Sequence, residues 1–126
     1  MTVLVGYTRT AEGRAALHHG REFAALLDAP LAIFPLFDID AATDWPSPEL
    51  LEEAGNQTQF LSRVPSSNHA AEELLDLGAQ IGARLVVIGV RSRSRVGKIL
   101  LGSDAQSIIL GSPIPVLSVK AENHEH

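Results

Sequence analysis

Leu85-Val86-Val87-Ile88-Gly89 is the stretch of sequence that indicates the fold most directly. A wholly apolar run that ends in glycine is typical of a buried strand leading into a turn. A basic segment follows, and Leu101-Gly102-Ser103-Asp104 then predicts the start of a short helix over residues 104–110. We expect the helix to end at Gly111-Ser112-Pro113, because glycine favours a helix C-terminus and proline cannot continue the helix. These residues therefore predict a strand, a loop and a helix in succession.

The predicted loop concentrates positive charge in a chain whose formal net charge is -5. Four of the chain's ten basic residues lie in it, at Arg91, Arg93, Arg95 and Lys98. A cationic loop that runs into a helix N-terminus favours the binding of a phosphate, because free backbone N–H groups, the helix dipole and mobile positive charge act together. The loop is therefore a candidate anion site.

The composition is that of a single globular domain. The chain has 126 residues, of which 45% are hydrophobic and 20% charged, and it contains no cysteine. The absence of cysteine excludes disulfides, thiolate zinc sites and cysteine nucleophiles. The negative net charge argues against general nucleic-acid binding, and the sequence contains neither a membrane-span pattern nor a signal-peptide pattern. We expect a cytoplasmic protein that contacts neither nucleic acid nor membrane.

Apolar strands and helices alternate along the whole chain. The strands are predicted over residues 2–7, 31–36, 59–64, 84–88 and 115–119. The helices are predicted over residues 11–28, 48–55, 69–83 and 104–110, with N-caps at Thr10, Ser47 and Asn68. This order predicts an α/β fold, a parallel sheet covered by helices on both faces in a three-layer sandwich. We expect one domain over residues 1–120 and a disordered tail over residues 121–126.

Other motifs are incomplete. Gly97-Lys98 does not complete a P-loop, because Ser92 stands where the first glycine is needed and Ile99 where Ser or Thr is needed. Neither a dinucleotide-binding Gly-x-Gly-x-x-Gly nor a hydrolase elbow around Ser103 is present. We expect no catalytic residue, and no metal site among the histidines of the first helix and the tail, His18, His19, His124 and His126.

The spacing of the loop resembles the signature of the universal stress protein family. That signature is Gly, two residues, Gly, nine residues, then Gly followed by Ser or Thr; here Gly89, Ser92 and Gly102-Ser103 occupy these places. The sequences of residues 96–103 and 112–119 are also similar to the family, and the resemblance covers essentially the whole chain.

The resemblance implies a Rossmann-like, five-stranded parallel sheet in the order 3-2-1-4-5. It also implies a homodimer joined through the last strand, Pro115 to Val119. In ATP-binding members the loop and the following helix hold the ribose and phosphates, and an aspartate after the first strand contacts the adenine. Carried over by position, the implied nucleotide contacts are Gly6, Thr8, Ile88, Gly89, Arg91, Ser92, Gly102 and Ser103.

This sequence departs from the family pattern at the proposed site. Thr8 stands where the adenine-contacting aspartate is expected, and Ser92 replaces the second glycine. Asp104 places a negative charge beside the proposed phosphate, whereas the arginines of the loop favour an anion. Two hypotheses follow. The protein is either a regulatory stress-response module that binds ATP or a related adenine nucleotide, or a nucleotide-free dimer that acts as a protein-interaction module with an unknown partner. Weak ATP hydrolysis is the most that the sequence supports as an enzymatic activity.

Overall fold

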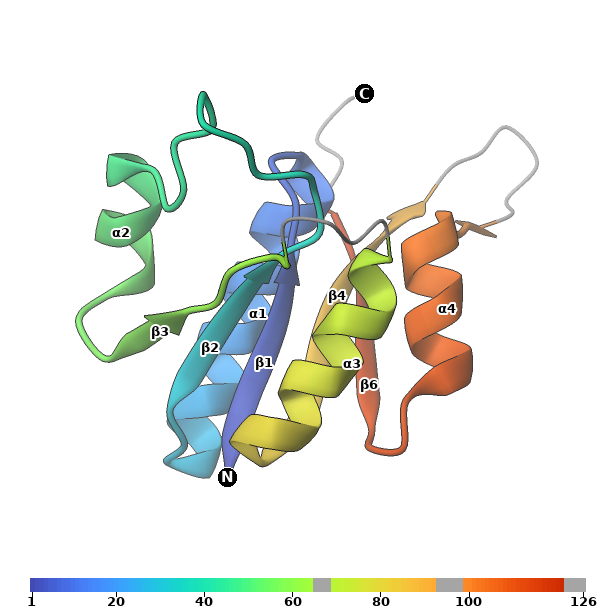
Figure 1. Cartoon of the computed structure of the whole chain (residues 1–126). Coiled ribbons are helices and arrows are strands. Elements are labelled where there is room, and N and C mark those ends of the chain that lie inside the picture. The colour runs from blue at the N-terminus through green and yellow to red at the C-terminus, as the bar shows by residue number, and fades with distance from the viewer. Residues whose placement is uncertain (65–68, 93–98, 122–126) are drawn as a thin grey trace, which may run out of the picture.

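The computed structural model describes residues 1–64, 69–92 and 99–121 of the chain. Its elements follow one another as predicted, with one short strand added (Figure 1). They are β1 (Thr2–Tyr7), α1 (Ala11–Leu27), β2 (Leu31–Pro35), α2 (Pro48–Ala54), β3 (Thr58–Phe60), α3 (Ala70–Ile81), β4 (Ala83–Ser92), β5 (Ile99–Leu100), α4 (Ser103–Gly111) and β6 (Val116–Lys120).

Five strands form one parallel sheet in the order β3-β2-β1-β4-β6. This is the predicted order 3-2-1-4-5, because β6 is the fifth parallel strand along the chain. The added strand β5 pairs antiparallel with the end of β4, with Arg91 opposite Leu100 and Ser92 opposite Ile99. The three-layer α/β fold is therefore confirmed.

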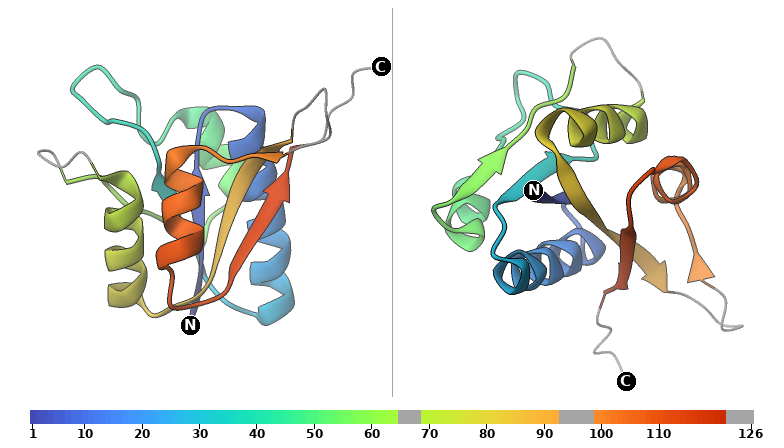
Figure 2. Two further views of the ribbon diagram at one scale, coloured as in Figure 1. Left: turned by 90° about the vertical axis from the view of Figure 1, so that its right-hand side faces the viewer. Right: turned by 90° about the horizontal axis from the view of Figure 1, so that it is seen from below.

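Helices cover both faces of the sheet (Figures 1 and 2). Alternate residues of β1 point to opposite faces, so that Val5 belongs to the core on the α1 side and Leu4 to the core on the side of α3 and α4. Val87 and Val86 divide in the same way in β4. All four side chains are at most 1% exposed. Burial on both faces explains why the central strands are continuously apolar in sequence.

Two of the predicted helix caps are present. The Gly13 N–H donates to Thr10 Oγ1 at 3.4 Å, and the Leu50 N–H donates to Ser47 Oγ at 3.2 Å. Asp28 ends α1 in the left-handed conformation at φ 52°, one residue past the last helical position. The third predicted cap, Asn68, lies outside the described residues, and α3 begins after His69.

Three predicted boundaries are wrong by two residues or more, and the others agree to within one residue. The third strand ends at Phe60 rather than at residue 64, and beyond it Trp45 Nε1 donates to the Leu61 carbonyl at 2.9 Å. The helix predicted to reach residue 83 ends at Ile81, because Gly82 adopts φ 71° and terminates it. The fourth strand extends to Ser92, so that Gly89, Arg91 and Ser92 belong to a strand and not to a loop. Of the predicted tail, residues 122–126 lie outside the described residues.

None of the helices in the described residues is long and apolar enough to cross a membrane.

Candidate functional site

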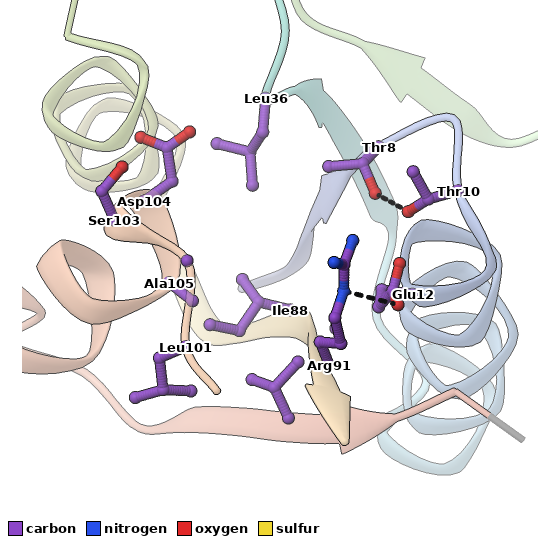
Figure 3. A pocket seen from close by; sticks show the side chains of 13 residues that line it. Thr8, Thr10, Glu12, Leu36, Ile88, Arg91, Leu101, Ser103, Asp104 and Ala105 are labelled. Carbon is purple, nitrogen blue, oxygen red and sulfur yellow. Dashed lines mark hydrogen bonds and ion pairs between the residues drawn. The ribbon is translucent and has the colours of Figure 1, made fainter. Parts of the chain in front are cut away.

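A cavity of about 450 Å³ opens where β1 and β4 end and α4 begins (Figure 3). Ligands of open α/β sheets bind beyond the carboxyl ends of the strands, and the volume is in the usual range for small-molecule sites. Four segments supply the walls: the β1–α1 connection with the first turn of α1, Leu36 after β2, the end of β4 and the start of α4. The lining residues are Thr8, Thr10, Glu12, Leu36, Ile88, Gly89, Val90, Arg91, Leu101, Gly102, Ser103, Asp104 and Ala105.

Most of the site residues carried over from the family pattern lie at this cavity, namely Thr8, Ile88, Gly89, Arg91, Gly102 and Ser103. Gly6 lies deeper, where an added Cβ would come within 2.8 Å of Leu36 Cδ1 and 3.1 Å of Ile88 Cγ2. Ser92 pairs with Ile99 in the β4–β5 ladder, and its side chain lies outside the described part of the structure. Of the predicted loop cations, Arg93, Arg95 and Lys98 lie outside the described residues.

Two glycines allow the wall formed by β1, α1 and β4 to close tightly. A Cβ at Gly13 would overlap the backbone of Thr8, and a Cβ at Gly89 would overlap the carbonyl oxygen of Glu12. The absence of these side chains lets the first turn of α1 rest directly on β4. At Gly102 an added Cβ would meet no described atom within 4 Å. Of these two glycines, Gly89 is therefore the one whose backbone packs directly against another segment, and Gly102 is not.

The N-terminus of α4 forms the opposite wall. The first intrahelical bond described for α4 runs from the Gln106 N–H to the Gly102 carbonyl at 3.0 Å. The backbone N–H groups of Ser103, Asp104 and Ala105 come before Gln106, so the helix itself offers them no carbonyl acceptor. An anion placed here would meet these N–H groups and the positive end of the helix dipole. The Asp104 carboxylate lies at the same helix end and repels such an anion.

Hydroxyl groups and one carboxylate line the wall formed by the β1–α1 connection. Thr8 Oγ1 and Thr10 Oγ1 are 2.7 Å apart and share a hydrogen bond. Hydrogen bonding to Thr10 lowers the pKa of the Glu12 carboxyl below its ordinary value of 4.5, and the positive charge of Arg91 adds to this effect. Glu12 is therefore ionised at neutral pH.

Glu12 is a lining residue that the sequence analysis missed. Its Oε2 lies 3.5 Å from Arg91 Nε, an ion pair across the junction of α1 and β4 (Figure 3). The first turn of a helix that follows a parallel strand lies at the carboxyl edge of the sheet. Glu12 could thus have been predicted as a site residue, because it is an acidic residue two positions after the predicted N-cap Thr10.

The described lining carries more negative than positive charge. Glu12 and Asp104 are acidic and lie on opposite sides of the cavity, whereas Arg91 is basic and projects between them from β4 (Figure 3). Leu36, Ile88 and Leu101 supply apolar surface. Such a site can contact a flat apolar group and hydrogen-bond a small polar or anionic group at the helix end.

Comparisons with known proteins find similar proteins that cover nearly the whole chain. The model of the universal stress protein family matches residues 1–120. A universal stress protein of Mycolicibacterium smegmatis is 40% identical over 127 residues, which cover 94% of this chain and 96% of the relative. A universal stress protein structure from Archaeoglobus fulgidus in complex with dAMP has the same fold, with a TM-score of 0.68, 19% identity and coverage of 94% of this chain and 96% of the other. A universal stress protein in complex with cAMP matches with a TM-score of 0.67, 24% identity and coverage of 97% and 98%. The chain belongs to the universal stress protein family.

Proposed function

We propose that this universal stress protein binds ATP or a related adenine nucleotide in the cavity between β1, β4 and α4, and that it acts as a regulatory module. The observation that carries the proposal is the position of the first turn of α4, whose residues 103–105 line a cavity bounded on the other side by the β1–α1 connection. A phosphate at those amides would place the sugar and base toward Ile88, Leu36 and Thr8. The dAMP and cAMP complexes of two relatives with the same fold support this choice of ligand.

Thr8 gives the proposed adenine contact a neutral hydroxyl instead of a carboxylate. A neutral hydrogen bond contributes about 1 kcal/mol, compared with about 1.5–3 kcal/mol for one to a charged group. We therefore propose that affinity depends on the amides of α4 and on Arg91 more than on contacts with the base.

Calorimetric titration with ATP, AMP and cAMP tests the proposal, with GMP to measure selectivity for adenine. Binding to the native state alone also raises the melting temperature, because each ligand stabilises only the folded protein. Arg91→Ala should weaken binding, whereas Arg84→Ala, at the exposed opposite end of the same strand, should not. The proposal is wrong if none of the adenine nucleotides gives heat or a melting shift at millimolar concentration.

The edge of the sheet favours a second candidate function, a homodimer that acts as a protein-interaction module. Within the described strands β6 pairs with β4 on one side only. Its residues Val116 and Leu117 are half-buried apolar side chains, and an apolar edge strand is a ready surface for a further strand. Pairing of β6 with its two-fold mate would cover this edge. Sedimentation at micromolar concentration decides between dimer and monomer, and mass spectrometry of the purified protein for retained nucleotide separates the two functions.

A further inference from the structure

The positive charge that a phosphate would use in the described part of the cavity is already engaged. Arg91 Nε lies 3.5 Å from Glu12 Oε2. The Arg91 side chain is 62% exposed, whereas that of Glu12 is 21% exposed. Figure 3 shows the guanidinium rising from β4 into the middle of the cavity, with Glu12 on the α1 side.

The carboxylate is the more fixed partner of this ion pair. Glu12 lies in the first turn of α1, and its backbone carbonyl is in direct contact with Gly89 of β4. Hydrogen bonding to Thr10 favours its ionised form. Arg91 reaches the pair through a long, mostly exposed side chain, so it can turn away without any change in the backbone.

An anionic ligand and Glu12 therefore compete for one guanidinium. The amides of α4 lie on the far side of the cavity from Glu12 (Figure 3). A phosphate at those amides offers Arg91 a second partner on the side away from Glu12, and turning toward it lengthens the contact between Arg91 Nε and Glu12 Oε2. The ion pair opposes this movement, and the Glu12 charge also repels the phosphate.

We infer that Glu12 sets the affinity of the cavity for anionic ligands by holding Arg91 until the phosphate of the ligand replaces the carboxylate. This inference rests on the proposed function and identifies a residue that determines specificity at the same site. It distinguishes ligands by charge: a nucleotide must displace Glu12 from Arg91, whereas an uncharged nucleoside enters with the pair intact.

Asp104 provides a matched control. It also lines the cavity and also carries one negative charge, but it lies at the α4 end. Glu12→Gln removes a charge and releases Arg91, whereas Asp104→Asn removes a charge and leaves the Glu12–Arg91 pair in place. Because Asp104 lies nearer the amides of α4, Asp104→Asn sets an upper bound on the gain from removing repulsion alone, and the Arg91→Ala background isolates the ion pair.

The test is calorimetric titration of the full chain with AMP and with adenosine. We expect Glu12→Gln to bind AMP about fivefold more tightly than the unmodified protein, the upper end of what an exposed ion pair contributes. Asp104→Asn should tighten AMP binding by the same factor with and without Arg91, and adenosine affinity should be the same in all of the variants. In the Arg91→Ala background, Glu12→Gln should give at most the gain of Asp104→Asn. Unchanged or weaker AMP binding in Glu12→Gln, or an equal gain with and without Arg91, would overturn the inference.

A second measurement needs no nucleotide. Phenylglyoxal modifies accessible arginines, and peptide mass spectrometry gives the rate at Arg91, with exposed Arg84 as an internal reference. We expect Glu12→Gln to raise the rate at Arg91 severalfold and to leave Arg84 unchanged. A faster Arg91 reaction with no nucleotide binding in any variant would refute the proposed function and support the ion pair. An unchanged rate with normal AMP binding would refute the role of Glu12 and leave the proposed function standing.

Discussion

The carbonyl oxygen of Glu12 lies so close to the Cα of Gly89 that an added Cβ at position 89 would overlap it. The neighbouring atoms are backbone, which cannot swing aside as a flexible side chain can. This contact joins the first turn of α1 to β4 and sets the position of both members of the Glu12–Arg91 pair.

Gly89→Ala should therefore destabilise the fold. Overpacking in a tight site costs about 1–3 kcal/mol, and we expect the upper part of that range because backbone has to shift. Urea unfolding followed by the fluorescence of Trp45, the single tryptophan of the chain, measures the free energy of unfolding.

Gly102→Ala is the matched control, since an added Cβ there meets no described atom within 4 Å. Gly102 is the N-cap of α4, where alanine is less favourable than glycine, so we expect a loss of under about 1 kcal/mol. Equal losses at Gly89 and Gly102 would show that the close contact with Glu12 does not constrain the fold.

The ionisation of Glu12 should make stability depend on pH. The folded-state pKa of this carboxyl lies below its ordinary value of 4.5, so the ionised form stabilises the folded protein. This contribution is fully present above about pH 4.5 and is lost as the pH falls through the lower, folded-state pKa. Urea titrations between pH 7 and pH 3 should show the stability difference between the unmodified protein and Glu12→Gln shrinking at the acidic end. A difference that stays constant over this range would contradict the pKa direction.

A buried ion pair connects the segment after β3 to α3. Arg63 Nε lies 3.1 Å from Glu73 Oε1, with side chains 5% and 9% exposed, and the Val64 N–H donates to the same oxygen at 2.8 Å. Removing one partner of a buried pair costs about 3–5 kcal/mol. We expect the lower end here, because Arg63 keeps the Phe37 carbonyl at 3.0 Å and Asp38 Oδ1 at 3.4 Å. Glu73→Ala should cost about that much in the free energy of unfolding, measured by chemical denaturation. The adjacent Glu72 is exposed, and Glu72→Ala should change stability by less than about 0.5 kcal/mol.

Thr8→Asp should tighten binding of adenine nucleotides. It restores a carboxylate at the position where the family pattern places the adenine contact, and a charged acceptor instead of a neutral one corresponds to a gain of about tenfold. Calorimetry with adenosine measures the effect without the added repulsion between the new carboxylate and a phosphate. Thr8→Asn has a similar size without the charge, so an equal gain in both variants would refute the role of the charge.

The central sheet could be predicted from local sequence because both of its faces are buried. Residues 31–34 and 85–88 are wholly apolar, and no other regular structure of that length buries such a run as well. The start of α1 was equally visible, because Thr10 precedes the first helical residue and accepts a hydrogen bond from Gly13. The spacing of Gly89, Gly102 and Ser103 identified the family, and most of the residues carried over from it lie at one cavity.

The errors concern contacts between distant segments. The extension of β4 depends on pairing that the local pattern does not show: Val90 pairs with Lys120 of β6, and Arg91 and Ser92 pair with Leu100 and Ile99 of β5. The third strand was extended too far because the chain leaves the sheet after Leu61. The Leu61 N–H still donates to the Ile33 carbonyl of β2, but its carbonyl accepts from Trp45 and the Val64 N–H donates to Glu73. Glu12 was missed because its role depends on a partner far away in the sequence, Arg91 of β4.

Because β4 extends beyond Gly89, the backbone at residues 90 and 91 loses its conformational entropy on folding rather than on ligand binding. Fixing the backbone of one residue costs about 1–2 kcal/mol of conformational entropy. Since Val90 pairs with Lys120 and Arg91 with Leu100, this loss occurs once, when the sheet forms, and is not repeated each time a ligand arrives. At position 91 of this described strand, the side-chain rotamers are what remains to be ordered. Substitutions at position 91 can thus change the charge of the cavity while the paired β4 backbone stays in place. This position is therefore suitable for engineering ligand preference without redesigning the fold.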